Sequence, residues 1–112
     1  MEFIYSAIAV FGLTAMLGMY LLTMLLRAKT IPTAAAFMHG LLAFTSLILL
    51  SVYTFGHPPG PWPSLIIFSL AATGGLFMIY RNITEQPIPK WLAIAHGLTA
   101  ITGFALLLIF AF

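Results

Sequence analysis

Two histidines, His39 and His96, are the only Asp, Glu, His, Lys or Arg residues inside the long apolar stretches of this 112-residue chain. Each stands seven residues after a proline, Pro32 or Pro89, and each is followed by Gly-Leu. A neutral imidazole offers one ring nitrogen as a metal ligand and the other as a hydrogen-bond donor. The pattern therefore indicates either ligation by a pair of imidazoles or a hydrogen bond between helices from each of them.

Other kinds of chemistry lack their residues. Catalysis by paired carboxylates or by a Ser/His/Asp arrangement needs an acid, and Glu85 lies in a polar segment outside the apolar stretches. A proton-coupled antiporter is disfavoured because Glu2, at one end of an apolar stretch, is a poor substitute for a membrane-embedded carboxylate. The chain has no cysteine, which excludes thiolate metal sites, iron–sulfur clusters and thioether-linked haem.

Composition decides the solvent. The chain is 62% hydrophobic and 5% charged, whereas about a quarter of the residues of soluble proteins are charged. A water-soluble fold is therefore excluded, and lipid must surround most of the chain. The four basic residues are too few and too dispersed to follow a phosphate backbone, so nucleic-acid binding is excluded as well.

The chain divides into four apolar runs, of which the third is the shortest. Each is able to span a bilayer, which takes about 20 residues of helix. Because the connections are short, the sequence predicts an all-α, integral membrane, up-and-down four-helix bundle that forms one domain over residues 1–112. The runs cover residues 3–26, 32–55, 62–80 and 89–112.

The basic residues predict the orientation. They lie in or beside the first and third connections, and the second connection has none. By the positive-inside rule we expect the segments 27–31 and 81–90 in the cytoplasm and both termini outside, in the plasma membrane of a bacterium or archaeon. The uncharged start predicts that the first run is retained rather than cleaved as a signal peptide. The basic residues are Arg27, Lys29, Arg81 and Lys90.

An internal repeat relates the two halves of the chain. A shift of 57 residues places 11 identical residues in the 25 positions from 31 to 55, His39 on His96 among them. The sequence therefore predicts two tandem two-helix repeats, about 1–56 and 57–112. Since each unit holds two helices, the copies share one orientation, and equivalent residues lie at equal depth around an axis along the membrane normal.

The repeat leads to a metal site. His39 and His96 lie about 10 Å from the cytoplasmic ends of the second and fourth helices. Those two helices are diagonally opposite if the order around the bundle follows the chain, on the order of 12–14 Å apart, which two imidazoles and a metal fill. Two imidazoles leave bare zinc or copper short of ligands, whereas a porphyrin supplies four more nitrogens. We therefore expect non-covalent haem b with His39 and His96 as axial ligands.

Small residues surround the predicted site and leave room for a macrocycle. Gly18 and Gly75 reach a similar depth on the first and third helices, where a flat ring can approach the backbone. Arg27 and Arg81 are expected to pair with the haem propionates, because their guanidinium groups are forked donors. The small residues next to the histidines on the second and fourth helices are Gly40, Gly97, Ala43 and Ala100, followed one turn later by Ser46 and Gly103.

Other interpretations of these residues stay open. Glycine and alanine in membrane helices serve close packing, and each histidine can simply hydrogen-bond to a neighbouring helix. Each histidine can also ligate a chlorin pigment by itself. Thr45 and Thr102, six residues after the histidines, are expected to bond back to their own helices, and His57 is expected to be exposed in the outer loop.

In its overall plan the chain resembles small four-helix membrane b-type cytochromes and the haem-bearing membrane anchors of respiratory enzymes. The resemblance implies an electron carrier, rather than a stand-alone enzyme, that passes electrons near the cytoplasmic face. Its short loops imply a redox partner, either a quinone or another subunit of a redox complex. The alternative is a cofactor-free or (bacterio)chlorophyll-binding accessory subunit of a larger membrane complex.

Overall fold

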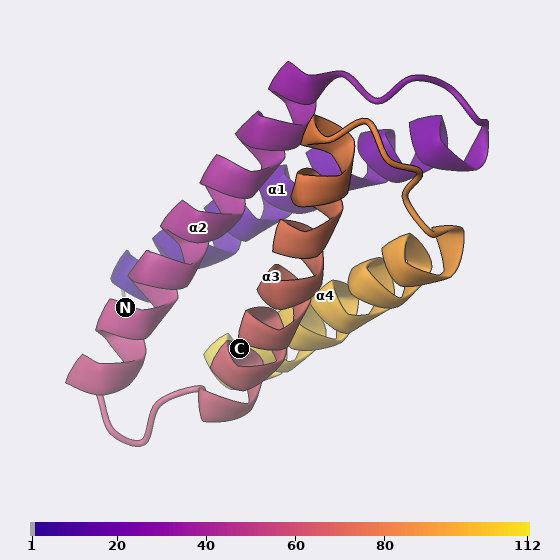
Figure 1. Ribbon diagram of the computed structural model, residues 1–112. Helices are drawn as coiled ribbons and strands as arrows, with labels where there is room; N and C mark the ends of the chain where they lie inside the picture. The colour runs from indigo at the N-terminus through magenta and orange to yellow at the C-terminus, as the bar shows by residue number, and fades with distance from the viewer. Residues whose placement is uncertain (1) are drawn as a thin grey trace.

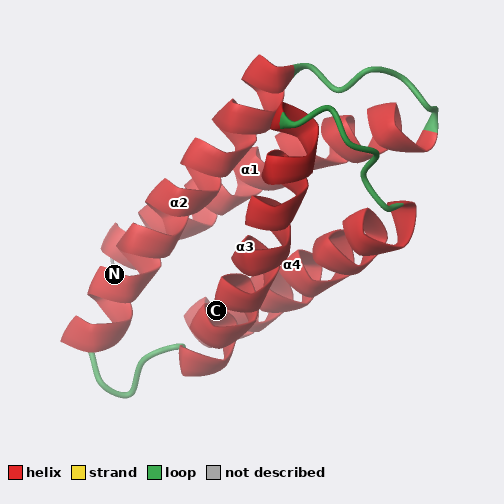
Figure 2. Ribbon diagram, viewed as in Figure 1, coloured by secondary structure: helices red, strands yellow, loops and turns green. Residues whose placement is uncertain are grey.

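The computed structural model describes residues 2–112, in which four helices are joined by three loops (Figures 1 and 2). This confirms the predicted all-helical chain with four long apolar helices. Each helix is long and apolar enough to cross a membrane. The helices are α1 (Glu2–Leu26), α2 (Thr33–Gly56), α3 (Trp62–Ile83) and α4 (Lys90–Ala111).

Prolines set the starts of the last three helices. Pro32, Pro61 and Pro89 are the N-cap residues of α2, α3 and α4. A proline has no N–H to leave unpaired at a helix start, and its carbonyl still accepts the first helical bond. The amides of Ala36 and Ala93 donate to the carbonyls of Pro32 and Pro89 at 3.1 and 3.2 Å. The punctuation seen in the sequence therefore acts through the backbone.

The third helix is longer than the sequence predicted. We expected its apolar run to end at Tyr80, but α3 continues to Ile83 and has 22 residues, as many as α4. The expectation that it is the shortest span is therefore wrong. Arg81 lies in the last turn, where a cation interacts favourably with the carbonyl end of a helix, and its Nε–H donates to Pro87 O at 2.7 Å. A charge at this position lies at the helix end without ending the helix.

The helices form an up-and-down bundle in chain order. α1 contacts α2 and α4, and α3 contacts α2 and α4, so that α1 faces α3 and α2 faces α4 across the two diagonals. Packing is more extensive within the α1–α2 and α3–α4 hairpins than between them. Both termini lie at the same end as the α2–α3 loop (Figure 1), where Tyr5 stacks on Phe112 with ring centroids 5.8 Å apart.

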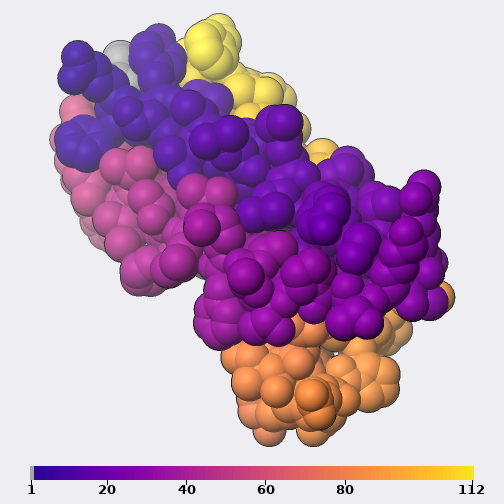
Figure 3. Space-filling model, turned by 90° about the horizontal axis from the view of Figure 1, so that it is seen from above, coloured from indigo at the N-terminus to yellow at the C-terminus, as the bar shows by residue number. Residues whose placement is uncertain are grey.

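The outer surface of the bundle is apolar. The body is elongated, 43 × 22 × 19 Å, and Figure 3 shows α1 and α2 side by side along its length. Large apolar side chains point outward on every helix, among them Met16, Leu41, Leu76 and Ile109, which are between 60% and 74% exposed. In water such a surface would be strongly unfavourable, and in a bilayer it contacts lipid chains. The structure is consistent with an integral membrane protein.

An aromatic pair fills the centre of the bundle. Phe11 of α1 and Phe68 of α3 stack across the diagonal, with ring centroids 3.9 Å apart and planes 7° apart. Gly103 of α4 lies against Phe68, because a Cβ built on the glycine would be 3.3 Å from two atoms of the phenyl ring. Ser46 of α2 is fully buried, and its hydroxyl donates to Leu42 O at 2.8 Å. Side chains therefore occupy the space that Ser46 and Gly103 were expected to leave for a macrocycle.

Positions 57 residues apart have the same environment in the two hairpins. Both members of each such pair are buried at several places along the helices. Thr45 and Thr102 also match, since their hydroxyls donate to Leu41 O and Leu98 O at 2.9 Å, as expected for threonines that bond back to their own helix. The buried pairs include Phe11 and Phe68, Thr14 and Ala71, Ala36 and Ala93, and Leu50 and Leu107.

Removing half of the aromatic pair should destabilise the bundle. Phe68→Ala is expected to lower the free energy of unfolding by about 3 kcal/mol, because it leaves a cavity and removes a ring stack. Leu70→Ala on the same helix is the matched control, since Leu70 is 63% exposed, and its expected loss is below about 0.5 kcal/mol. The measurement is reversible unfolding by SDS in mixed micelles. Equal losses in the two variants would contradict a central role for the stack.

Candidate functional site

The two histidines meet inside the bundle. His39 of α2 and His96 of α4 lie on the diagonal, and their ring centroids are 6.1 Å apart with the planes at 76°. Both side chains are half-buried. The structure therefore brings together two side chains that are 57 residues apart in the sequence.

Each ring is held by a hydrogen bond to the neighbouring helix of its own hairpin. Nδ1 of His39 lies 3.0 Å from Thr14 O on α1, and Nδ1 of His96 lies 2.7 Å from Ala71 O on α3. A carbonyl oxygen only accepts, so Nδ1 carries the proton and donates in both rings. Nε2 then keeps its lone pair, and it makes no hydrogen bond within residues 2–112. This tautomer is the one that ligates a metal through Nε2.

Two glycines make room for the imidazole rings. A Cβ built on Gly18 would lie 2.8 Å from His39 Cε1, and one built on Gly75 would lie 3.2 Å from His96 Cε1. Each glycine stands four residues after the carbonyl that accepts the histidine bond, at Thr14 or Ala71. A side chain at the glycine would collide with the ring before the bond could form. The flat ring that approaches these glycines is thus the imidazole itself.

The other small residues near the histidines differ in their surroundings. A Cβ on Gly40 would lie 3.1 Å from Ile79 Cδ1, so this glycine serves close packing of α2 against α3. Gly97 has no atom within 4 Å of the corresponding point. Ala43 and Ala100, one turn after the histidines, are both half-buried.

The two arginines lie at the loop end of the bundle that is nearer to the histidines. Arg81 donates to the carbonyl of Pro87 in the α3–α4 loop, and its guanidinium carbon is 5.7 Å from the centroid of the Phe77 ring. Arg27 follows the end of α1 and is exposed. Arg81 is therefore half engaged by its own loop, whereas Arg27 extends into the surroundings.

His57 behaves as an outer-loop residue. It follows α2, is exposed, and stacks on Tyr53 with ring centroids 4.5 Å apart. Its Nδ1 lies 3.1 Å from Tyr53 O, the carbonyl four residues earlier. His57 thus belongs to the end of the bundle opposite to the histidine pair, as the sequence predicted.

The histidine pair does not hold a bare metal ion in the usual way. Within residues 2–112, no group of three or more His, Asp or Glu side chains lies together. Zinc in proteins takes four ligands, three of them at least from the protein. A metal at this site would need further ligands from a group bound with it.

Sequence reasoning missed the carbonyl groups that orient the two rings. Thr14 and Ala71 differ in type, so a search for identical residues does not pair them, although they are 57 residues apart. The histidine bond uses only their backbone oxygens. The one available signal was the glycine four residues later in each hairpin, Gly18 or Gly75.

No protein-family model, curated protein sequence or solved structure matches this chain. The class of protein is therefore defined by the fold and the site together: a bundle of four membrane-length helices with one pair of facing histidines.

A side chain at Gly18 should displace His39. In Gly18→Ala the new Cβ would be 2.8 Å from His39 Cε1, so we expect the ring to move, the bond to Thr14 O to weaken, and stability to fall by about 1–3 kcal/mol. Gly12→Ala on the same helix is the control, because nothing lies within 4 Å of its Cβ, and no loss is expected there. SDS unfolding gives the stability, and ¹⁵N spectra of the histidine rings report the bond. An unshifted His39 Nδ1 signal in Gly18→Ala would contradict the contact.

Proposed function

We propose that this chain is an integral membrane b-type cytochrome, in which His39 and His96 are the axial ligands of one non-covalent haem b. One observation carries the proposal: two facing imidazoles 6.1 Å apart, each tied through Nδ1 with Nε2 left for a ligand. Histidine is a common axial ligand of haem iron in proteins. The bound haem supplies a one-electron iron couple, so the proposed role is electron transfer.

The spacing of the rings supports this choice. A metal–imidazole bond is about 2.0–2.1 Å long, so two such bonds and the radii of two rings come to about 6 Å. The ring centroids are 6.1 Å apart before any ligand is bound. In metal sites the second ring nitrogen of a histidine almost always donates to a carboxylate, a carbonyl or water, which fixes the ring and strengthens the ligand nitrogen. The carbonyls of Thr14 and Ala71 do this for the two rings.

The donor set also fits a porphyrin better than a bare ion. Two histidine nitrogens satisfy only two positions of a metal, and a porphyrin brings four nitrogens of its own. Packing is looser between the two hairpins than within them, so the plane between the hairpins is where a macrocycle would enter. Gly18, Gly75 and the alanines Ala43 and Ala100 would border it, and Arg27 and Arg81 at the loop end would pair with propionates.

The proposal includes the origin and orientation of the bundle. We propose that the two hairpins arose by tandem duplication, since residues 57 positions apart share identity, burial and the same histidine bond. All four basic residues lie at the end formed by the α1–α2 and α3–α4 loops, which favours a cytoplasmic location for that end in a bacterial or archaeal plasma membrane. A quinone or another redox-complex subunit would exchange electrons with the haem.

A second function is favoured by a specific observation. Each histidine bond joins the two helices of one hairpin, α1 to α2 or α3 to α4, and such bonds also stabilise membrane helices that carry no cofactor. A cofactor-free accessory subunit of a larger complex would use the histidines in this way. A chlorin-binding subunit would in addition use Nε2 of each ring separately.

The visible spectrum separates these functions. Purified in mild detergent after expression with ample haem supply, the protein is expected to give a sharp low-spin b-type α band on reduction, with about one haem per chain. His39→Ala and His96→Ala should each abolish that band, because either change removes an axial ligand. His57→Ala is the control and should keep the band, since His57 is exposed in the outer loop.

A flat reduced-minus-oxidised spectrum in the unchanged protein would contradict the cytochrome proposal and favour the packing role. A red absorption band without redox dependence would favour chlorin ligation. Unchanged cofactor content in both His39→Ala and His96→Ala would exclude these residues as ligands, whichever pigment is bound.

The orientation is testable because the chain has no native cysteine. His57→Cys lies in the outer loop and Gln86→Cys in the α3–α4 loop, and both positions are exposed. A membrane-impermeant maleimide added to intact cells is expected to label His57→Cys at once and Gln86→Cys only after permeabilisation. The reverse pattern would invert the proposed topology without changing the site.

A further inference from the structure

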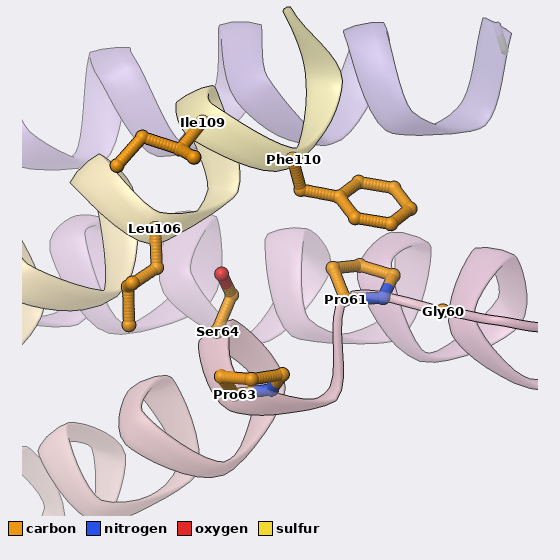
Figure 4. Close-up of a pocket in the computed structure, with 7 residues that line it drawn as sticks. All are labelled: Gly60, Pro61, Pro63, Ser64, Leu106, Ile109 and Phe110. Atoms are coloured by element: carbon orange, nitrogen blue, oxygen red, sulfur yellow. The ribbon is translucent and has the colours of Figure 1, made fainter.

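A surface hollow of about 240 Å³ lies between α3 and α4, at the end of the bundle away from the histidines. Pro61 and Pro63 line it from the start of α3, and Leu106, Ile109 and Phe110 line it from the last turns of α4 (Figure 4). Ile109 is 74% exposed, so the hollow opens toward the lipid side of the bundle. Its wall is almost wholly apolar, with one exception.

The exception is the hydroxyl of Ser64. This residue is 1% exposed, and Figure 4 shows its oxygen directed from α3 toward α4 and into the hollow. The hydroxyl makes no hydrogen bond within residues 2–112, whereas Ser69, on the same helix, donates to Leu65 O at 2.7 Å. A buried hydroxyl without a partner is unfavourable by about 1–3 kcal/mol. A ligand that presents an acceptor oxygen at this point would remove that penalty.

The size and shape of the hollow select the rest of the ligand. An engineered apolar cavity of about 150 Å³ holds one benzene ring, so 240 Å³ is enough for one substituted ring. The rings of Pro61, Pro63 and Phe110 form much of the lining, and flat walls complement a flat ring better than a flexible chain. The open side leaves a path for a long apolar tail into the bilayer.

We infer that this hollow binds the ring of a lipid-soluble quinone, with a quinone carbonyl accepting the hydrogen bond of the Ser64 hydroxyl. The choice of a quinone over other one-ring ligands rests on the proposed function, which needs an electron partner that reaches the protein from the membrane. The hollow and the free hydroxyl do not depend on it. Leu106 follows His96 by ten residues on α4, so the two sites are about 15 Å apart along the helix.

Quenching of tryptophan fluorescence by decylubiquinone tests the inference. Trp62 lies beside the hollow at the start of α3, and Trp91 lies at the start of α4, at the other end of the bundle. In a Trp91→Phe background in nanodiscs we expect saturable quenching of Trp62. In a Trp62→Phe background the remaining Trp91 should be quenched only in proportion to the bulk quinone concentration.

Two serine variants on α3 form a matched pair. Ser64→Ala is expected to weaken decylubiquinone binding about fivefold, because it removes one hydrogen bond. Ser69→Ala, whose hydroxyl is already bonded to Leu65 O, should bind as tightly as the unchanged protein. Linear quenching of Trp62, or equal affinity for Ser64→Ala and Ser69→Ala, would overturn the inference. Displacement of the quinone by an equal amount of phosphatidylglycerol would also overturn it and make the hollow a lipid site.

The haem content of the same preparations separates this inference from the proposed function. Saturable binding that depends on Ser64 in protein without haem would sustain the quinone site while the cytochrome proposal failed. A full haem spectrum together with linear quenching would do the opposite.

Discussion

The hydrogen bond from each histidine ring to a carbonyl of the adjacent helix is the interaction on which the site depends. In a bilayer no water is available to satisfy a buried imidazole, so its N–H must find an acceptor within the protein. Helical carbonyls already accept a bond from their own helix, but their second lone pair remains open where no side chain shields it. Gly18 and Gly75 leave the carbonyls of Thr14 and Ala71 accessible in this way. The two glycines, the tautomer and the ring positions therefore follow from one requirement.

This requirement also couples the site to the fold. Each bond ties the two helices of one hairpin together, and the aromatic stack of Phe11 on Phe68 joins the hairpins across the other diagonal. Phe11 and Phe68 each stand three residues, nearly one helical turn, before the accepting carbonyl. The bundle is thus closely packed on the side of the termini, while the histidines lie beyond the stack toward the basic end. A ligand between the rings would be bounded by phenyl groups on one side and by the loops on the other.

Much of the architecture was predictable because hydrophobic length and proline positions act locally. Four helices, their starts after Pro32 and Pro89, and the facing of His39 and His96 across the diagonal were expected from the sequence and are present. The continuation of α3 to Ile83 was not expected, because a charged residue can lie in the last turn of a helix as well as beyond it. The carbonyl partners were missed because any residue type supplies a backbone oxygen. The filling of the centre by the two phenyl rings depends on packing distances that no sequence pattern records.

The second nitrogen of each ring decides between a packing role and a ligand role. A histidine that only joins two helices needs one donor and one acceptor carbonyl, and both histidines already have these through Nδ1. Each then holds an unbonded Nε2 next to the other ring at the centre of the bundle, where an unsatisfied acceptor is unfavourable. A threonine or serine at the same place would join the helices without that penalty, through a single hydroxyl. Keeping imidazoles at both equivalent positions is therefore better explained by a group that takes both Nε2 lone pairs at once, as the iron of one haem does.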